Sequence, residues 1–261
     1  MMIQDMESLK DLATEFHIEL QKEQIQQFQI YYEYLIEKNK VMNLTTITEK
    51  EDVIFKHFLD SLSLYKIVEF GERLYSSEYL EKEQKKKLYF NQNCRILDLG
   101  TGAGFPGLPL KIAFKETNVV LADSLQKRVL FLEELIKMLG LTGVTAIHGR
   151  AEELARKEDY REKFELCVSR AVANLSVLLE YCLPFVSVGG YFIAYKSAEI
   201  EEELEESKKA ISILGGKLER KETFLLPHSE IGRSFIVIKK VKSTGKKYPR
   251  IAGKPSREPI H

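Results

Sequence analysis

The chain has 261 residues, 44% of them hydrophobic, and its 39 basic side chains are balanced by 39 acidic ones. This length suffices for a full α/β core with a smaller appended region, and the zero net charge excludes a general attraction to nucleic acids. The three cysteines form no C-x-x-C pair and the five histidines are scattered. We therefore expect no disulfide, no metal site and a reducing, cytoplasmic location.

Residues 1–70 are predicted to be helical, because apolar residues recur at helical spacing, namely Ile25, Phe28, Tyr32 and Leu35. Thr48 and Glu51 have the spacing of a capping box, which predicts a helix that begins there and ends near Glu69. On that helix a polar group lies opposite the apolar arc, and its spacing alone favours a solvated face: His57, Asp60 and Ser61. Residues 71–93 are charged and weakly patterned, so we expect a surface linker there.

From Cys94 onward, predicted strands and helices alternate. Strands are expected over 95–99, 118–122, 144–147, 165–168 and 191–195, and helices near 106–116, 125–139, 151–162, 174–186 and 199–214. Two further strands, 220–226 and 234–239, have no helix between them, which predicts an antiparallel hairpin. Residues 94–240 are therefore predicted to form a Rossmann-like α/β domain with a mostly parallel, seven-stranded sheet. The terminal hairpin is typical of class I methyltransferases.

The most informative stretch, Ile96–Gly107, is a short apolar strand followed by a glycine-rich loop and the start of a helix. Glycines at 100, 102 and 104 give the spacing G-x-G-x-G rather than the dinucleotide fingerprint G-x-G-x-x-G. Asp98 before the loop would repel a pyrophosphate but suits the ammonium group of S-adenosylmethionine. Asp123, at the end of the next strand, is placed to accept hydrogen bonds from ribose hydroxyls. The loop therefore favours S-adenosylmethionine over a nicotinamide cofactor.

The segment 241–261 is predicted to be a basic tail. From Lys239 to Arg257 there are eight basic residues and no acidic one. Such a strip on a neutral protein favours contact with an RNA backbone over a solvated, disordered terminus. The expected RNA-binding residues are Lys246, Lys247, Tyr248, Arg250 and Lys254. The apolar stretch 176–195 is interrupted by Glu180 and Pro184, and the N-terminus lacks a signal peptide, so we expect no membrane contact.

Several motifs together resemble the RsmG (GidB) family of bacterial 16S rRNA guanine-N7 methyltransferases. They are the loop Leu97–Gly107 and the stretches Asn43-Leu44-Thr45, His57–Leu62, Gly149–Glu153, Ser169-Arg170-Ala171 and Tyr248-Pro249-Arg250. The resemblance implies methylation of guanine 527, in the 530 loop of 16S rRNA, by a monomer that uses S-adenosylmethionine and acts on rRNA or the small ribosomal subunit.

The resemblance also implies roles for individual residues. Gly100 and Phe105 would line the cofactor loop, and Ala151 and Glu152 would hold the adenine end of the cofactor. Arg170 would bind either a cofactor carboxylate or an rRNA phosphate. The candidates for substrate positioning are His57, Asp60, Arg170 and Lys196, and Ser197 stands where the family has glycine.

The residues alone leave alternatives open. Ser169-Arg170-Ala171-Val172 replaces the Asn/Asp-Pro-Pro-Tyr/Phe motif that positions an exocyclic amine, which argues against adenine-N6 and cytosine-N4 methylation. A small-molecule methyltransferase would share the cofactor loop but would not need the basic tail. A non-enzymatic ribosome-assembly protein would need the tail but not the intact loop.

Overall fold

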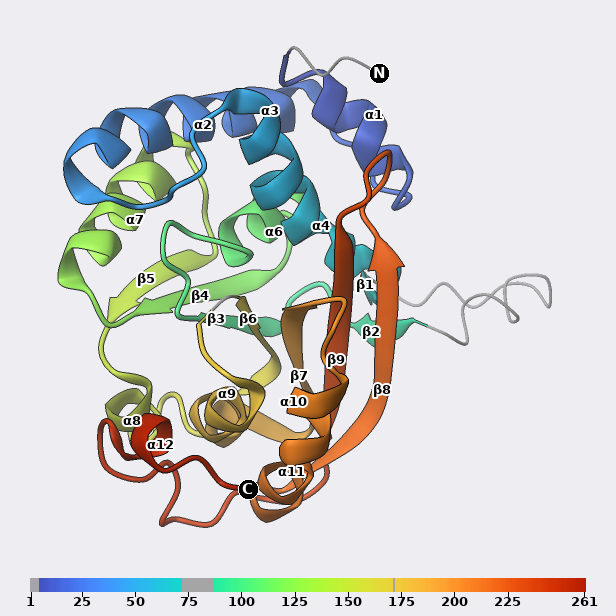
Figure 1. The fold of residues 1–261 in the computed structure, drawn as a ribbon. Helices are drawn as coiled ribbons and strands as arrows, with labels where there is room; N and C mark the ends of the chain where they lie inside the picture. The colour runs from blue at the N-terminus through green and yellow to red at the C-terminus, as the bar shows by residue number, and fades with distance from the viewer. Residues whose placement is uncertain (1–4, 72–86, 171) are drawn as a thin grey trace.

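Seven strands form the central sheet of the computed structural model, which describes residues 5–71, 87–170 and 172–261 (Figure 1). They are β3 (Arg95–Leu99), β4 (Asn118–Asp123), β5 (Val144–His148), β6 (Phe164–Arg170), β7 (Val186–Ser197), β8 (Gly216–Leu225) and β9 (Gly232–Lys240). Their order across the sheet is β5-β4-β3-β6-β7-β9-β8. The first five are parallel, and β9 is antiparallel to both β7 and β8. The predicted fold class and terminal hairpin are confirmed.

Helices cover both faces of the sheet (Figure 1). On one face lie α6 (Gly107–Ala113) and α7 (Gln126–Met138). The other face carries α8 (Ala151–Leu154), α9 (Leu175–Cys182), the 3-10 turn η3 (Leu183–Phe185), α10 (Glu201–Glu206), α11 (Lys208–Ile213) and α12 (Lys254–Arg257). Two apolar clusters match this arrangement, since buried side chains gather separately on the α6/α7 side and on the α9/α11 side of the sheet. None of the helices within the described ranges is long and apolar enough to cross a membrane.

The N-terminal region adds a third layer over α6 and α7. It contains α1 (Ser8–Thr14), α2 (Lys22–Met42), α3 (Lys50–Val53), the π-helix η1 (Ile54–Leu59), α4 (Asp60–Leu62) and the 3-10 turn η2 (Ser63–Lys66). Gln24 donates to the backbone carbonyls of Ile112 and Ala113, and Gln27 donates to that of Leu139. These carbonyls lie at the ends of α6 and α7, where a helix has no partners of its own. Side chains of α2 therefore complete the helices beneath it.

Three details of the N-terminal prediction are wrong. Helix α3 begins at Lys50 with Glu49 at the N-cap and no side-chain cap, so Glu51 sits one position too early for a capping box. The helical chain ends at Lys66, and β1 (Val68–Phe70) follows and pairs in parallel with β2 (Leu88–Phe90). Asp60 is only 2% exposed rather than solvated. Most of the expected linker, residues 72–86, lies outside the described residues.

Two predicted helices are shorter than expected. Helix α8 ends at Leu154, and the chain then turns, with Arg161 donating to the Ala155 carbonyl and Glu162 at a left-handed φ of 52°. The predicted helix 199–214 is divided into α10 and α11 at Ser207. The buried Ser207 hydroxyl donates to the Glu203 carbonyl, a side-chain bond that competes with regular helix geometry.

Candidate active site

The loop between β3 and α6 is packed too closely for side chains at two of its glycines. Gly100 and Gly104 have φ of 72° and 106°. A Cβ on Gly100 would lie 2.5 Å from Val172 Cγ2, and one on Gly104 would lie 2.6 Å from the Tyr31 hydroxyl. That hydroxyl donates to the Ala103 carbonyl at 2.6 Å. The predicted glycine loop therefore lies between α2 and the segment that follows β6.

Asp98, at the end of β3, anchors this loop from beneath. Its Oδ2 accepts hydrogen bonds from the Thr101 hydroxyl at 2.6 Å and the Gly107 N–H at 2.7 Å. Oδ1 is buried and has no hydrogen-bond partner among the described residues. Burial raises the pKa of Asp98 to about 6, although its hydrogen bonds lower it in part. A cationic ligand group would satisfy this free oxygen, so the site fits the ammonium that the sequence predicts.

A first cavity, of about 160 Å³, opens at the carboxyl ends of β3, β4 and β5. Four predicted cofactor residues line it: Gly100, Asp123, Ala151 and Glu152. Asp123 Oδ2 accepts the Gly102 N–H at 2.9 Å and lies 3.4 Å from Arg128. Glu152 is 5% exposed. Further lining residues are Leu99, Ala122, Ser124, Gly149, Arg150, Val172 and Tyr181.

A second cavity, of about 380 Å³, lies beyond the ends of β6 and β7, and its lining includes all four residues predicted to position the substrate. The complete lining is Ile47, Lys56, His57, Asp60, Arg170, Tyr195, Lys196, Ser197 and Arg233. The two cavities lie on either side of the β3/β6 boundary, where the strand order reverses. Open α/β sheets bind ligands at this switch point.

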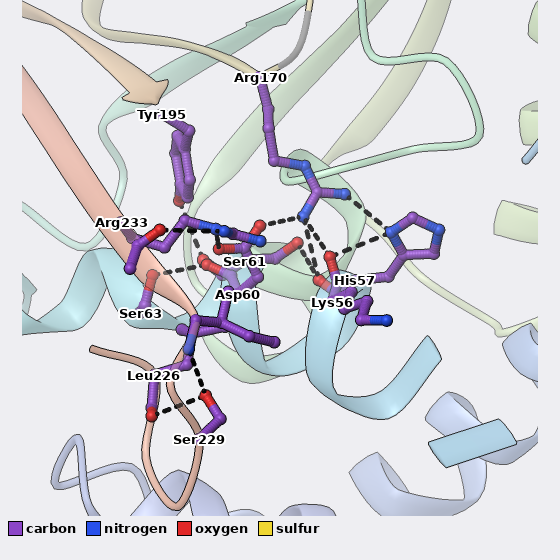
Figure 2. Close-up of polar contacts among 12 residues, drawn as sticks. Lys56, His57, Asp60, Ser61, Ser63, Arg170, Tyr195, Leu226, Ser229 and Arg233 are labelled. Atoms are coloured by element: carbon purple, nitrogen blue, oxygen red, sulfur yellow. Dashed lines mark hydrogen bonds and ion pairs between the residues drawn. The ribbon is translucent and has the colours of Figure 1, made fainter. Parts of the chain in front are cut away.

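Asp60 joins three elements in the wall of the second cavity (Figure 2). Its Oδ2 accepts from Arg170 Nη1 and its Oδ1 from Arg233 Nε, both at 2.7 Å. Arg170 also donates to the backbone carbonyl of Lys56 at 3.1 Å. Arg170 therefore faces the second cavity, and these hydrogen-bond acceptors belong to the η1–α4 segment rather than to the first cavity.

His57 is held between the same arginine and the glycine loop. Its Nδ1 lies 3.3 Å from Arg170 Nη2 and 3.2 Å from the Lys56 carbonyl oxygen, and its Nε2 lies 2.8 Å from the Thr45 hydroxyl. Burial and the Arg170 charge lower the pKa of His57 to about 3, so the ring is neutral at pH 7. The ring stacks on Phe105 at a centroid distance of 4.5 Å, and Phe105 stacks on Tyr31 at 5.2 Å.

Phe105 is thus placed beside His57 and does not line the first cavity. Its predicted contact with the cofactor stays a prediction. Lys196 donates to the Ala173 carbonyl at 2.8 Å and pairs with Glu203 at 2.5 Å, so a carboxylate compensates its charge.

Arg233 and Tyr195 were not predicted as site residues. Tyr195 lies two positions before the end of β7 and donates to the Ser61 carbonyl at 2.9 Å. Arg233 lies on β9 opposite Ser197 of β7. The only signal that marks Arg233 in the sequence is its position just before the apolar strand residues Phe235–Ile238.

The basic tail is folded against the domain. Lys246 and Lys247 are exposed, whereas Tyr248 is buried and Arg250 forms an ion pair with the buried Glu180 at 2.6 Å. Lys254 pairs with Glu258 at 3.4 Å. RNA contact by these five residues stays a prediction, with Lys246 and Lys247 the most accessible of them. In the part of the chain that the structure describes, no group of three or more His, Cys, Asp or Glu side chains could hold a metal ion.

The comparisons with known proteins identify the family of this chain. A sequence model of the GidB family, rRNA small subunit methyltransferase G, matches residues 24–231. The Ribosomal RNA small subunit methyltransferase G of Lachnoclostridium phytofermentans is 54% identical over 93% of this chain and 92% of its own length. The protein of the same name from Lactobacillus acidophilus is 48% identical over 95% and 96%, respectively. Among solved structures, M. jannaschii TYW2 in complex with AdoMet is similar over 64% of this chain and 77% of that chain, with 19% identity and a TM-score of 0.45. The family match and the identity of these relatives establish that the chain belongs to the GidB family of rRNA small subunit methyltransferases, as its motifs predict.

Proposed function

We propose that the protein transfers the methyl group of S-adenosylmethionine to N7 of guanine 527 in the 530 loop of 16S rRNA, as a cytoplasmic monomer. Family membership supports an rRNA methyltransferase. The observation that supports transfer between two bound reactants is the pair of cavities on either side of the β3/β6 switch point. Acidic side chains line the first and basic side chains gather in the second.

The first cavity suits the cofactor. Asp98 Oδ1, buried and unpartnered within the described ranges, lies beneath the loop that borders this cavity rather than in its lining, and it would accept a hydrogen bond from the ammonium group. Asp123 lies where a ribose hydroxyl can donate to it, and Glu152 can accept from the exocyclic amine of adenine. The bound cofactor would supply an electrophilic methyl group.

The second cavity suits the target nucleotide. Four cationic side chains line it together with the carboxylate of Asp60: Lys56, Arg170, Lys196 and Arg233. A positive groove is the common feature of proteins that hold single-stranded RNA, and an unstacked base can enter a cavity beside it.

The reaction needs no general base, because guanine N7 has an in-plane lone pair and no proton to lose. This chemistry agrees with His57, whose ring nitrogens contact Arg170, the Lys56 carbonyl and the Thr45 hydroxyl and whose ring stacks on Phe105. The chain's main contribution would be alignment of the two reactants, which can supply roughly 7–11 kcal/mol of the barrier.

A methyl-transfer assay tests this proposal. Small ribosomal subunits from a strain that lacks the gene are incubated with the protein and labelled S-adenosylmethionine, and the modified nucleotide is mapped. Label at N7 of guanine 527 is expected. Label at another nucleotide would overturn the assignment of the target, and label only on small molecules would overturn the rRNA substrate.

A further inference from the structure

The C-terminal segment 248–257 crosses α8 and α9 next to the first cavity (Figure 1). Its strongest attachment is Arg250. The guanidinium donates from Nη2 to Glu180 Oε2 at 2.6 Å and from Nε to Oε1 at 2.9 Å, and the Arg250 N–H donates to Oε1 at 2.7 Å. Glu180 lies on α9 and is 1% exposed. A two-point arginine–carboxylate contact of this kind fixes both partners in orientation as well as position.

Two further attachments reach side chains that line the first cavity. The Gly253 N–H donates to Glu152 Oε1 at 2.9 Å. The Ser256 hydroxyl lies 2.8 Å from the hydroxyl of Tyr181. Both Glu152 and Tyr181 line the first cavity. The segment thus attaches at positions 250, 253 and 256, and two of these three attachments are to the cavity wall.

The carbonyl groups of the segment are also held. Arg156 donates to the Pro249 carbonyl at 2.7 Å, and Arg161 donates to the Tyr248 carbonyl at 3.0 Å. Both arginines belong to the turns that follow α8. The segment is therefore fixed to the element that carries Ala151 and Glu152, the two residues assigned to the adenine end of the cofactor.

We propose that segment 248–257 is a working part of the cofactor site, in which Arg250 acts as a positioning residue. By holding Gly253 against Glu152, it fixes the carboxylate that receives the adenine amine. This inference rests on the proposed cofactor. It extends the site beyond the family match, which ends at residue 231.

The contact has a clear physical consequence. Glu152 is 5% exposed, and a carboxylate this well buried needs its hydrogen bonds to keep one orientation. With the segment in place, Gly253 occupies Oε1 and leaves Oε2 to face a ligand. With the segment detached, Glu152 would gain water and rotamer freedom, and binding would have to order it again.

Hydrogen exchange on the wild-type protein gives the first test. Amides of residues 250–257 are followed by mass spectrometry with and without saturating S-adenosylmethionine, and no RNA is added. Slower exchange in this segment on cofactor binding is expected. If calorimetry shows cofactor binding but exchange in the segment is unchanged, the inference is wrong and the proposed function still stands. If the protein does not bind the cofactor, the proposed function is wrong.

Variants give the second test. Arg250→Gln should weaken S-adenosylmethionine binding about tenfold and increase the KM for the cofactor. Lys242→Gln removes one charge from an exposed side chain of the neighbouring segment and should leave cofactor affinity within about twofold of wild type. Ser256→Ala, at an exposed position outside the expected RNA-binding residues, is the mild variant and should raise the KM for the cofactor about twofold with an unchanged KM for rRNA.

The inference is contradicted if folded Arg250→Gln protein, with its thermal transition intact, binds the cofactor with wild-type affinity. It is also contradicted if KM for the cofactor and KM for rRNA rise together in Ser256→Ala, since that pattern would indicate a general loss of structure. Arg250→Lys, which keeps the charge but makes a one-point contact, should recover part of the affinity.

Discussion

Replacing Asp60 with alanine should destabilise the protein by about 3 kcal/mol, because it removes the carboxylate that lies between two guanidinium groups. Asp60 is 2% exposed, and its oxygens lie 2.7 Å from both Arg170 and Arg233. Breaking a buried ion pair costs roughly 3–5 kcal/mol. The lower end applies here, since the Arg170 and Arg233 side chains keep 12% and 24% exposure and can regain some water.

Urea denaturation of wild type and Asp60→Ala, with an unchanged m value, measures this difference. The triple variant Asp60→Leu/Arg170→Met/Arg233→Met is the matched control. It removes all three charges, so its stability should lie within about 1 kcal/mol of wild type. A destabilisation smaller than about 1 kcal/mol in Asp60→Ala would refute the argument that this carboxylate compensates buried charge.

The same triple variant separates stability from function. It should bind S-adenosylmethionine normally, because none of its three positions lines the first cavity. Methyl transfer to small ribosomal subunits should fall at least about a hundredfold, since two cations are removed and the segment that carries His57 is no longer fixed in position. Wild-type turnover in a folded triple variant would show that the second cavity does not hold the substrate.

Three further outcomes are expected. S-adenosylmethionine affinity, measured by calorimetry between pH 5 and 7, should fall as the pH drops through about 6. Burial raises the pKa of Asp98 to about 6, and the protonated carboxyl group cannot pair with an ammonium group. The variant Asp98→Asn should bind weakly, and its affinity should not depend on pH in this range. Folding stability should decrease as the pH falls below about 6.5. Burial lowers the pKa of His57 to about 3 in the folded protein, so only the unfolded chain takes up the proton in this range. In urea titrations, His57→Asn should reduce the dependence of the unfolding free energy on pH. Replacing Lys246 and Lys247 with glutamine should make rRNA binding less dependent on salt. The slope of log K against log salt concentration should decrease by roughly 0.7 for each phosphate that the variant no longer neutralises. Equal slopes for variant and wild type would exclude a role of these lysines in RNA binding.

The sheet was predictable from sequence because each strand carries its own local signal. Alternation of apolar runs with helical periods predicts parallel strands, and two strands without a helix between them predict the β8–β9 hairpin. Helix ends were less predictable, because tertiary contacts decide them. Ser207, for example, divides one predicted helix through a buried hydroxyl whose partner Ser176 is 31 residues away.

The two cavities also differ in how far the sequence predicts them. Gly100, Asp123, Ala151 and Glu152 follow the ends of neighbouring strands, so strand order alone places them together around the first cavity. Asp60 meets Arg233 across 173 positions of sequence, and no local pattern encodes that pairing. The helical pattern around Asp60 predicted a solvated face. Helical spacing separates a polar face from an apolar face, but it does not show whether another layer of the protein covers the polar face.

The charges of the second cavity can be explained by the proposed reaction. Methylation of N7 moves positive charge onto the guanine, so an uncompensated cation beside the base would oppose the transfer by Coulomb repulsion. The guanidinium of Arg170 shares Asp60 with Arg233, and Lys196 is paired with Glu203. Burial, together with the Arg170 charge, keeps the His57 ring neutral by lowering its pKa to about 3. Because two guanidinium groups share one carboxylate, this cluster keeps one net positive charge and several hydrogen-bond donors for a polyanion, while Asp60 and Glu203 reduce the repulsion at the acceptor nitrogen.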